Sequence, residues 1–116
     1  MGLTFKENCP DIRNSKVVDL IRHLHTYGIT PVAVDPWVSP HEVSKELDIT
    51  LLSLPELEGM DCIVFAVAHD EFKGIDAKKL DKLFCACPND EKVIIDVKSM
   101  LCKDDIQGQG YRYWRL

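Results

Sequence analysis

The hydrophobic residues of this chain are grouped in short runs, and their spacing changes along the sequence. From residue 15 to residue 27 they recur every three or four positions, which predicts an amphipathic helix with one buried stripe. Residues 62–68, CIVFAVA, are apolar throughout, which is typical of a strand covered on both faces. Strands and helices then alternate to the end of the chain. This order predicts parallel pairing with right-handed crossovers.

Capping and turn residues indicate where the elements begin and end. Asn14 or Ser15 can cap the start of the helix at 15–27, and Gly28 lies where a left-handed residue ends a helix. The expected strands are residues 2–4, 30–34, 62–68, 93–97 and, at the edge, 111–114, the expected helices are 15–27, 41–47 and 75–87, and residues 49–54 are weakly defined. The helix residues expected to be buried are Val17, Val18, Leu20, Ile21 and Leu24 in the first helix and Ile75, Leu80, Leu83 and Phe84 in the last. Together these elements predict an α/β fold, Rossmann-like and in three layers, with a mainly parallel sheet.

The composition narrows the class of protein. With 116 residues, of which 46% are hydrophobic and 28% charged, the chain has the size and balance of one soluble globular domain. A net charge of −5 argues against a general nucleic-acid or membrane-surface binder, which needs a broad basic face. No apolar run approaches the ~20 residues of a membrane-spanning helix, and no signal peptide opens the chain. The 5 cysteines, an odd number, favour reduced thiols in the cytoplasm.

Cations stand beside the ends of the expected strands, where open parallel sheets bind their ligands. Lys6 follows the first strand, Arg13 precedes the first helix, and Lys98 follows the fourth strand. A cation near a helix N-terminus is unfavourable unless an anion is present, so a bound phosphate would explain these positions. A second explanation stays open, because Glu7 and Asp11 are close enough in sequence to pair with Lys6 and Arg13 and leave a solvated loop.

The residues FKENCPDIRNSKV carry more information than their charges. They place Phe5-Lys6 a few residues before Asp11-Ile12-Arg13-Asn14-Ser15 and a helix. In this they resemble the start of the C-terminal domain in the UDP-glucose/GDP-mannose dehydrogenase family. Asp35-Pro36, AVAH at 66–69 and IDVK at 95–98 match later blocks of the same pattern, so the resemblance covers essentially the whole chain. The variant NCPD and the closing YWRL are most similar to the branch that acts on N-acetylated UDP-hexosamines.

The resemblance implies a function and a role for four residues. Members of the family are NAD-dependent enzymes that oxidise the C6 hydroxymethyl group of a UDP-sugar, here a UDP-N-acetylhexosamine or UDP-glucose, to the carboxylate. Their C-terminal domain closes over the active site as a lid. By position, Phe5, Lys6 and Lys98 would contact the substrate, with Lys6 near the pyrophosphate, and Arg13 would reach toward NAD. Many relatives have arginine at the position of Lys98, and lysine lacks the bidentate fork of arginine.

The resemblance also implies that the rest of the enzyme lies outside these residues. In the family the NAD-binding domain, the central helices and the catalytic cysteine precede this motif, and no glycine-rich strand–turn–helix occurs here. We therefore expect residues 1–116 to form a single UDP-sugar-binding domain of a larger cytoplasmic dehydrogenase, without a catalytic residue or a metal of its own. NAD is expected to be bound mainly by the other domain. The expected partners are the UDP-sugar, the enzyme's own N-terminal and central domains and, at full length, further subunits, but neither nucleic acid nor a membrane.

Two other classes of protein remain open. A phosphoacceptor receiver domain also alternates strands and helices, but it needs an acidic cluster after the first strand, where this chain has FKEN. A free-standing regulatory or interaction module without catalysis would leave the cations without a ligand, and titration with UDP-sugars distinguishes it.

Other residues with reactive side chains favour structural roles. Cys9 as a nucleophile, Cys85 with Cys87 as zinc ligands and His69 with Asp70 as a catalytic pair are the less favoured alternatives. Cys62, Cys85 and Cys102 are expected in the core or near the surface, Asp70 as a helix cap, and Trp37 and Trp114 as packing anchors, with an interdomain cleft as the alternative for Trp37. His23 and His25, two positions apart on one helix, face different directions and are not expected to form a metal site.

Overall fold

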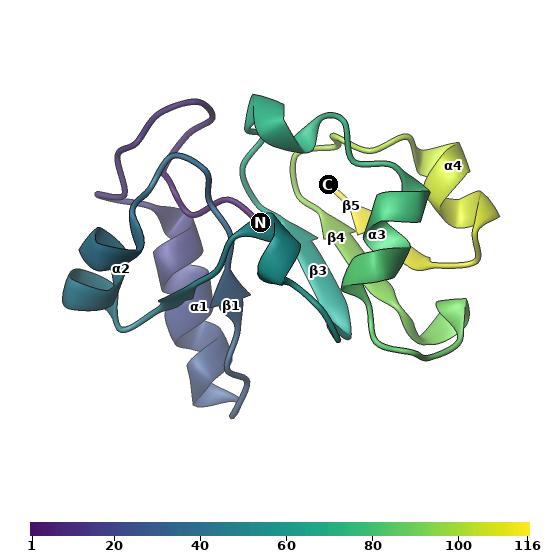
Figure 1. Ribbon diagram of the computed structural model, residues 1–116, viewed down its shortest axis with the longest axis horizontal. Helices are drawn as coiled ribbons and strands as arrows, with labels where there is room; N and C mark the ends of the chain where they lie inside the picture. Colours follow the sequence, from purple (N-terminus) through teal and green to yellow (C-terminus); the bar gives the residue numbers. More distant parts are fainter.

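Helices and parallel strands alternate along the chain, as the hydrophobic pattern predicts (Figure 1). The computed structural model describes the backbone of residues 1–116 and all side chains except those of residues 45–46. The helices are α1 (Lys16–Thr26), α2 (Pro40–Leu47), α3 (Ala77–Leu83) and α4 (Lys103–Gly108). The strands are β1 (Val32–Ala33), β2 (Thr50–Leu51), β3 (Cys62–Phe65), β4 (Val93–Asp96) and β5 (Arg112–Arg115). Short 3₁₀ turns lie at Leu54–Glu56, Asp70–Phe72 and Asn89–Glu91.

The strands form two parallel sheets that the N-terminal segment joins. β1 pairs with β2, and in the second sheet β4 pairs with β3 on one side and β5 on the other. Between the sheets, the Gly2 amide donates to the Val34 carbonyl at 2.8 Å, and the Ala66 amide donates to the Met1 carbonyl at 2.9 Å. The N-terminus accordingly lies between β1 and β3 (Figure 1). The order β2, β1, N-terminal segment, β3, β4, β5 is that of the Rossmann fold.

The expected regular strand at residues 2–4 is wrong, and Gly2 gives the reason. Its φ of +87° takes the backbone out of the extended conformation. A Cβ added there would lie 2.4 Å from the Cβ of Val67, so only glycine lets the segment pass this close to the chain that follows β3. The segment therefore fills the position of a central strand without the dihedral angles of one.

Helix α1 has the predicted caps but a narrower buried face than predicted. The Ser15 hydroxyl accepts from the Val17 amide at 3.2 Å and donates to the Leu3 carbonyl at 2.6 Å, which ties the helix start to the N-terminal segment. Val18 and Ile21 are buried, whereas Leu20 is 39% exposed, so its predicted burial is wrong. Leu20 lies roughly 130° around the helix from the middle of the buried stripe. Val17 and Leu24 are partly buried, and Gly28 ends the helix with a φ of +75°.

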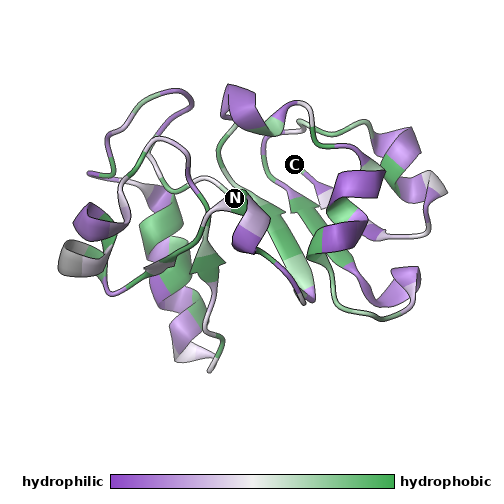
Figure 2. Cartoon of the chain, viewed as in Figure 1, coloured by the Kyte–Doolittle hydropathy of each residue, from purple (hydrophilic) through white to green (hydrophobic). Residues whose placement is uncertain are grey.

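Two hydrophobic cores support the two halves of the chain. One joins α1, α2 and β1 through buried residues that include Leu3, Val18, Ile21, Ala33 and Val43. The other joins β3, β4, α3 and α4 through residues that include Phe65, Leu80, Ile94 and Ile106. Figure 2 shows the hydrophobic residues along β3 and β4 and on one stripe of α1.

Helix α3 is shorter than the predicted 75–87. Asp76 caps it, with its carboxylate accepting from the Lys79 amide at 2.9 Å, so Ile75 lies before the helix. At the other end Phe84 forms a parallel bridge with Met60 and thereby leaves the helical path. Both Ile75 and Phe84 are nevertheless buried, as the apolar spacing predicts.

The second face of β3 is covered less than its apolar sequence predicts. Ile63 and Phe65 are buried, but Val64 is only partly buried and Cys62 is exposed. The register places Val64, Ile95 and Trp114 in one row across β3, β4 and β5. Because Trp114 is 53% exposed, the prediction that it anchors the packing is wrong. β5 itself is the predicted edge strand.

The cysteines differ from the expectation of five reduced thiols. Cys85 and Cys87 are joined by a disulfide in the loop after α3, with their Cα atoms 5.5 Å apart. Cys9, Cys62 and Cys102 are free, and the last two are exposed. Partial desolvation by the surrounding chain raises the pKa of the Cys62 thiol. Among the described side chains no group of three or more His, Cys, Asp or Glu residues could hold a metal ion.

We predict that Gly2→Ala lowers the free energy of unfolding by about 3 kcal/mol or more, because it adds a clash to an unfavourable φ. Gly28→Ala is the matched control, since its φ is also positive but no atom lies within 4 Å of the added Cβ. The control should cost only about 1 kcal/mol. Urea unfolding of the three chains measures both values, and equal losses would contradict the close approach of Gly2 to Val67.

We also predict that stability rises between pH 6 and pH 8 because of the Met1 amino group. Burial lowers its pKa from the ordinary 8.0 to about 6, although the Asp35 carboxylate acts in the raising direction. The unfolded chain then binds more protons in this interval, so stability is reduced below pH 6 and the loss disappears above pH 8. The total effect is on the order of 2 kcal/mol.

Urea unfolding from pH 5.5 to pH 8.5 (about the span of the two pKa values) tests this effect against the same chain with an acetylated N-terminus. Acetylation removes the titrating group and leaves the histidines unchanged. Parallel pH curves for the two chains would mean that the amino group does not contribute.

Candidate functional site

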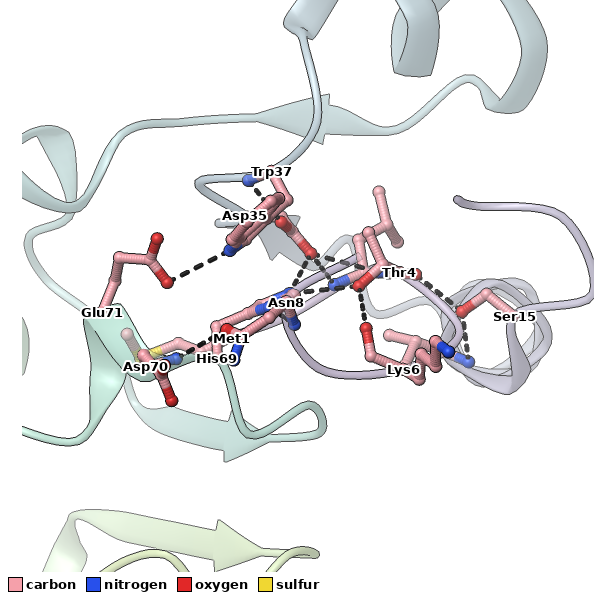
Figure 3. A network of polar contacts seen from close by, with 12 residues as sticks. Met1, Thr4, Lys6, Asn8, Ser15, Asp35, Trp37, His69, Asp70 and Glu71 are labelled. Carbon is pink, nitrogen blue, oxygen red and sulfur yellow. Dashed lines mark hydrogen bonds and ion pairs between the residues drawn. The ribbon is translucent and has the colours of Figure 1, made fainter. Parts of the chain in front are cut away.

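A buried carboxylate lies where the N-terminal segment, the end of β1 and the chain after β3 meet. Asp35 follows β1 and is 5% exposed. Its Oδ2 accepts from the amides of Leu3 at 2.6 Å and Thr4 at 3.1 Å, and its Oδ1 accepts from the Trp37 amide at 2.8 Å. Figure 3 shows these groups converging on the carboxylate. Asp35 therefore fixes two backbone turns at the carboxyl edge of the sheet.

His69 completes this cluster from the other side. Its Nδ1 accepts from the Asn8 amide at 2.9 Å, so the hydrogen is assigned to Nε2, which lies 2.9 Å from Oδ2 of Asp35. The Thr4 hydroxyl lies 3.1 Å from the same Nε2 and donates to the Lys6 carbonyl at 2.9 Å. Every polar atom of His69 and Asp35 thus has a partner, which a buried pair requires.

The pairing of His69 with Asp70, which the sequence analysis holds as the less favoured alternative, does not form. The carboxylate bound to His69 is Asp35, which comes 34 residues earlier in the chain. Asp70 instead pairs with Lys73, and its amide donates to Oδ1 of Asn8 at 3.0 Å. The Lys73 ammonium, followed by Asn8, lowers the pKa of the Asp70 carboxyl. Its expected role as a helix cap is wrong, because no side chain caps the turn at Asp70–Phe72.

Trp37 covers the buried pair at the surface. Its ring stacks on the His69 ring at 6.3 Å between centroids, and its Nε1 donates to Glu71 at 3.2 Å. Trp37 is 39% exposed, so one face packs on the site and the other is open at the carboxyl edge of the sheet. It is the packing anchor that the sequence predicts.

The loop of residues 5–14 carries three of the four predicted contact residues, Phe5, Lys6 and Arg13. Asn8 and Asn14 turn it with positive φ angles of 53° and 58°, and the Phe5 amide donates to the Asp11 carbonyl at 2.9 Å. Arg13 binds Asp11 through two side-chain hydrogen bonds of 2.9 and 3.0 Å. These bonds lower the pKa of the Asp11 carboxyl to about 2 and raise that of the Arg13 guanidinium.

The ion pair predicted as the alternative therefore forms at Arg13. Lys6 differs, because among the described side chains its ammonium has no carboxylate within salt-bridge distance. It lies 5.6 Å from the centre of the Phe5 ring, and that ring is 49% exposed. The loop thus presents an aromatic face and a positive charge to solvent.

A second buried carboxylate, that of Asp96 at the end of β4, shapes the turn that carries Lys98. Asp96 accepts from the amides of Met100 at 3.0 Å and Leu101 at 2.8 Å and from the Tyr113 hydroxyl at 2.9 Å. Burial, followed by this hydrogen bond, raises the pKa of Tyr113. Lys98 stands on the resulting turn and is exposed. Since it follows a strand parallel to the N-terminal segment, it lies at the same edge of the sheet as Lys6.

A cavity of about 380 Å³ beside this edge was not apparent from the sequence. Its floor includes Val34, Leu52 and Phe72, and its rim carries Glu56 and Glu71. These residues are far apart in the sequence, and only the fold brings them together. The acidic rim is unfavourable for a phosphate group.

The described residues do not fit a complete NAD site. A dinucleotide-binding turn needs glycines between the first strand and its helix, and residues 4–15 contain none. The acidic residue that would bind a ribose in such a fold is Asp35, and its oxygens are already engaged by backbone amides and His69. The described residues at this edge therefore lack the glycine-rich turn and the free acidic residue of a dinucleotide site.

Comparison with known proteins identifies the family of the chain. Residues 1–103 match the family model of the UDP-glucose/GDP-mannose dehydrogenase family, UDP binding domain. The chain is 47% identical over 104 residues to a UDP-N-acetyl-D-glucosamine 6-dehydrogenase of Pseudomonas aeruginosa. The aligned segment covers 90% of this chain and 24% of that protein. It is 36% identical over 101 residues to the Salmonella typhi protein of the same name, covering 87% and 23%.

A solved structure shares the fold of this chain. The crystal structure of an NDP-N-acetyl-D-galactosaminuronic acid dehydrogenase from Methanosarcina mazei Go1 superposes with a TM-score of 0.82 at 22% identity, over 98% of this chain and 23% of that one. The chain thus spans about a quarter of the length of the curated relatives that it matches. No helix within the described residues is long and apolar enough to cross a membrane. By its family match and its identity to these relatives, the chain belongs to the UDP-glucose/GDP-mannose dehydrogenase family and corresponds to its UDP binding domain.

Proposed function

We propose that this chain is the substrate-binding lid of a cytoplasmic, NAD-dependent UDP-sugar 6-dehydrogenase. The observation that carries the proposal is the loop of residues 5–14, which is held from below by buried polar groups and presents Lys6 and Phe5 outward. A flexible loop would lose affinity to ordering on binding, whereas a loop anchored in this way is already arranged. The family match and the names of the relatives support the same assignment.

In this proposal the two lysines bind the pyrophosphate of the nucleotide sugar. Lys6 supplies a charge without a competing carboxylate among the described side chains, and Lys98 supplies a second one from the neighbouring turn. The N-terminus of α1 adds its partial positive charge at the same edge. The exposed ring of Phe5 contacts the substrate beside Lys6. As a point charge, Lys98 attracts the diphosphate without fixing its orientation.

The sugar is proposed to be an N-acetylated hexosamine. Two relatives at 47% and 36% identity are named UDP-N-acetyl-D-glucosamine 6-dehydrogenases, and a UDP-glucose 6-dehydrogenase of Rickettsia bellii is 26% identical. The reaction, oxidation of the C6 hydroxymethyl group to the carboxylate, needs NAD and a catalytic cysteine from other domains of the same polypeptide. Arg13 contributes one contact to NAD by exchanging its Asp11 partner for a phosphate when the lid closes.

We predict that the 116-residue chain binds UDP weakly, with a dissociation constant in the millimolar range or above, and forms no NADH from UDP-N-acetylglucosamine and NAD. Half of a cleft lacks the contacts and the preorganisation of the closed site. Titration with UDP followed by amide NMR shifts, together with absorbance of NADH, measures both. Shifts confined to regions away from residues 5–14 and 98, or NADH formation by this chain alone, would contradict the lid proposal.

A chimera tests the proposed roles in catalysis. In it this chain replaces the matched quarter of the Pseudomonas aeruginosa relative. We predict that Lys6→Ala lowers kcat/KM for the UDP-sugar about tenfold to a hundredfold, since one charge-assisted phosphate contact contributes roughly 1.5–3 kcal/mol. Arg13→Ala should act mainly by raising the KM for NAD.

Lys82→Ala, in the last turn of α3, is the matched control, because it removes an exposed lysine at the opposite edge of the sheet and should leave kcat/KM for both substrates unchanged. The kinetics are measured with UDP-sugar and NAD varied separately. Unchanged kcat/KM for both substrates in Lys6→Ala would identify the loop as a solvated surface and favour a free-standing module.

A further inference from the structure

His69 is a fully buried side chain that binds the proposed substrate loop through the loop's backbone. Its two ring nitrogens face different elements: Nδ1 accepts from the Asn8 amide at 2.9 Å, and Nε2 lies 2.9 Å from Asp35. The ring is stacked against Trp37 and meets the edge of Phe72 at 5.7 Å between centroids. Neighbours on both sides therefore prevent the imidazole from turning.

The loop next to it has little other support. Residues 5–8 are all exposed, so their side chains contribute no core packing. Asn8 has a left-handed backbone, which is unfavourable for a residue other than glycine and needs specific contacts to persist. Those contacts are the Nδ1 of His69 and the amide of Asp70. The anchoring of Asn8 therefore depends on two polar contacts, and His69 supplies the one to its backbone.

His69 also contacts Thr4, which precedes Lys6 in the chain. The Thr4 hydroxyl lies 3.1 Å from Nε2 and donates to the Lys6 carbonyl, so the backbone is tied to the His69 cluster both at Lys6 and two residues later. We propose that His69 is a positioning residue: by holding the backbone at Asn8 and Lys6, it sets the direction in which Lys6 and Phe5 meet the nucleotide diphosphate. The consequence for binding rests on the proposed function, whereas the ordering of the loop does not.

Two substitutions separate the two ring nitrogens. An asparagine at residue 69 can place its carbonyl oxygen near the position of Nδ1 and accept from the Asn8 amide. A glutamine can place its amide nitrogen near the position of Nε2 and donate to Asp35, but it leaves Asn8 without an acceptor. His69→Gln should therefore free the loop, and His69→Asn should restore its order even if the carboxylate loses a donor.

The experiment uses the 116-residue chain with amide hydrogen exchange and titration with UDP. In His69→Gln we expect the Asn8 amide to exchange at least about tenfold faster, as the loss of one buried hydrogen bond implies, and UDP to bind several-fold more weakly. In His69→Asn both values should stay within about twofold of the wild type. The amide of Ile94, in the middle of β4, reports on global stability, and His25→Gln, at an exposed histidine of α1, is the matched control.

The wild-type chain supplies a measurement that does not depend on a variant folding. Nitrogen-15 NMR of the imidazole should show His69 with its hydrogen on Nε2 and none on Nδ1. A hydrogen on Nδ1, or unchanged exchange of the Asn8 amide in His69→Gln, would overturn the positioning role. UDP-induced shifts confined to regions away from residues 5–14 and 98, with the exchange results as expected, would count against the proposed function alone.

Discussion

The burial of the Asp35 carboxylate is the constraint on which the rest of this domain depends. A charge removed from water must be surrounded by donors, and here the donors come from three segments that are distant in sequence: the amides of Leu3 and Thr4, the amide of Trp37, and His69. The carboxylate can be satisfied only if the N-terminal segment lies between β1 and the chain after β3. One side chain thereby joins two short sheets that share no regular strand.

The acidic residues at the ends of the strands serve the backbone. Asp35 after β1 and Asp96 at the end of β4 both accept from amides of the turn that follows, so each carboxylate shapes the chain that leaves its strand. Negative and positive side chains are therefore separated at the carboxyl edge of the sheet. The carboxylates of Asp35 and Asp96 are turned inward and satisfied, while the side chains of Lys6 and Lys98 are exposed to solvent.

Arg13 and Lys6 show how the same loop can hold two cations in different states. The guanidinium of Arg13 is engaged in a bidentate pair with Asp11, two residues earlier, which its planar fork favours. The ammonium of Lys6 lies beside an aromatic ring and keeps its charge available. An exposed pair such as Asp11–Arg13 contributes little net stability, so a ligand phosphate can replace the carboxylate at small cost. In the proposed function, the ammonium of Lys6 is therefore available to a ligand as it stands, whereas Arg13 first exchanges Asp11 for the ligand phosphate.

Much of this protein was determined by the sequence itself, because its signals are local. The apolar spacing gave α1 and the buried strands, Ser15 and Gly28 marked the helix ends, and the motif from Phe5 to Ser15 carried the family. The features that depend on contacts between residues distant in sequence were decided only by the tertiary structure. Leu20 is exposed because one narrow stripe of α1 reaches the core, and residues 2–4 lose strand geometry because Gly2 passes against Val67. The partner of His69 is Asp35, from another strand end, because parallel strands bring their carboxyl ends together whatever their separation in the chain.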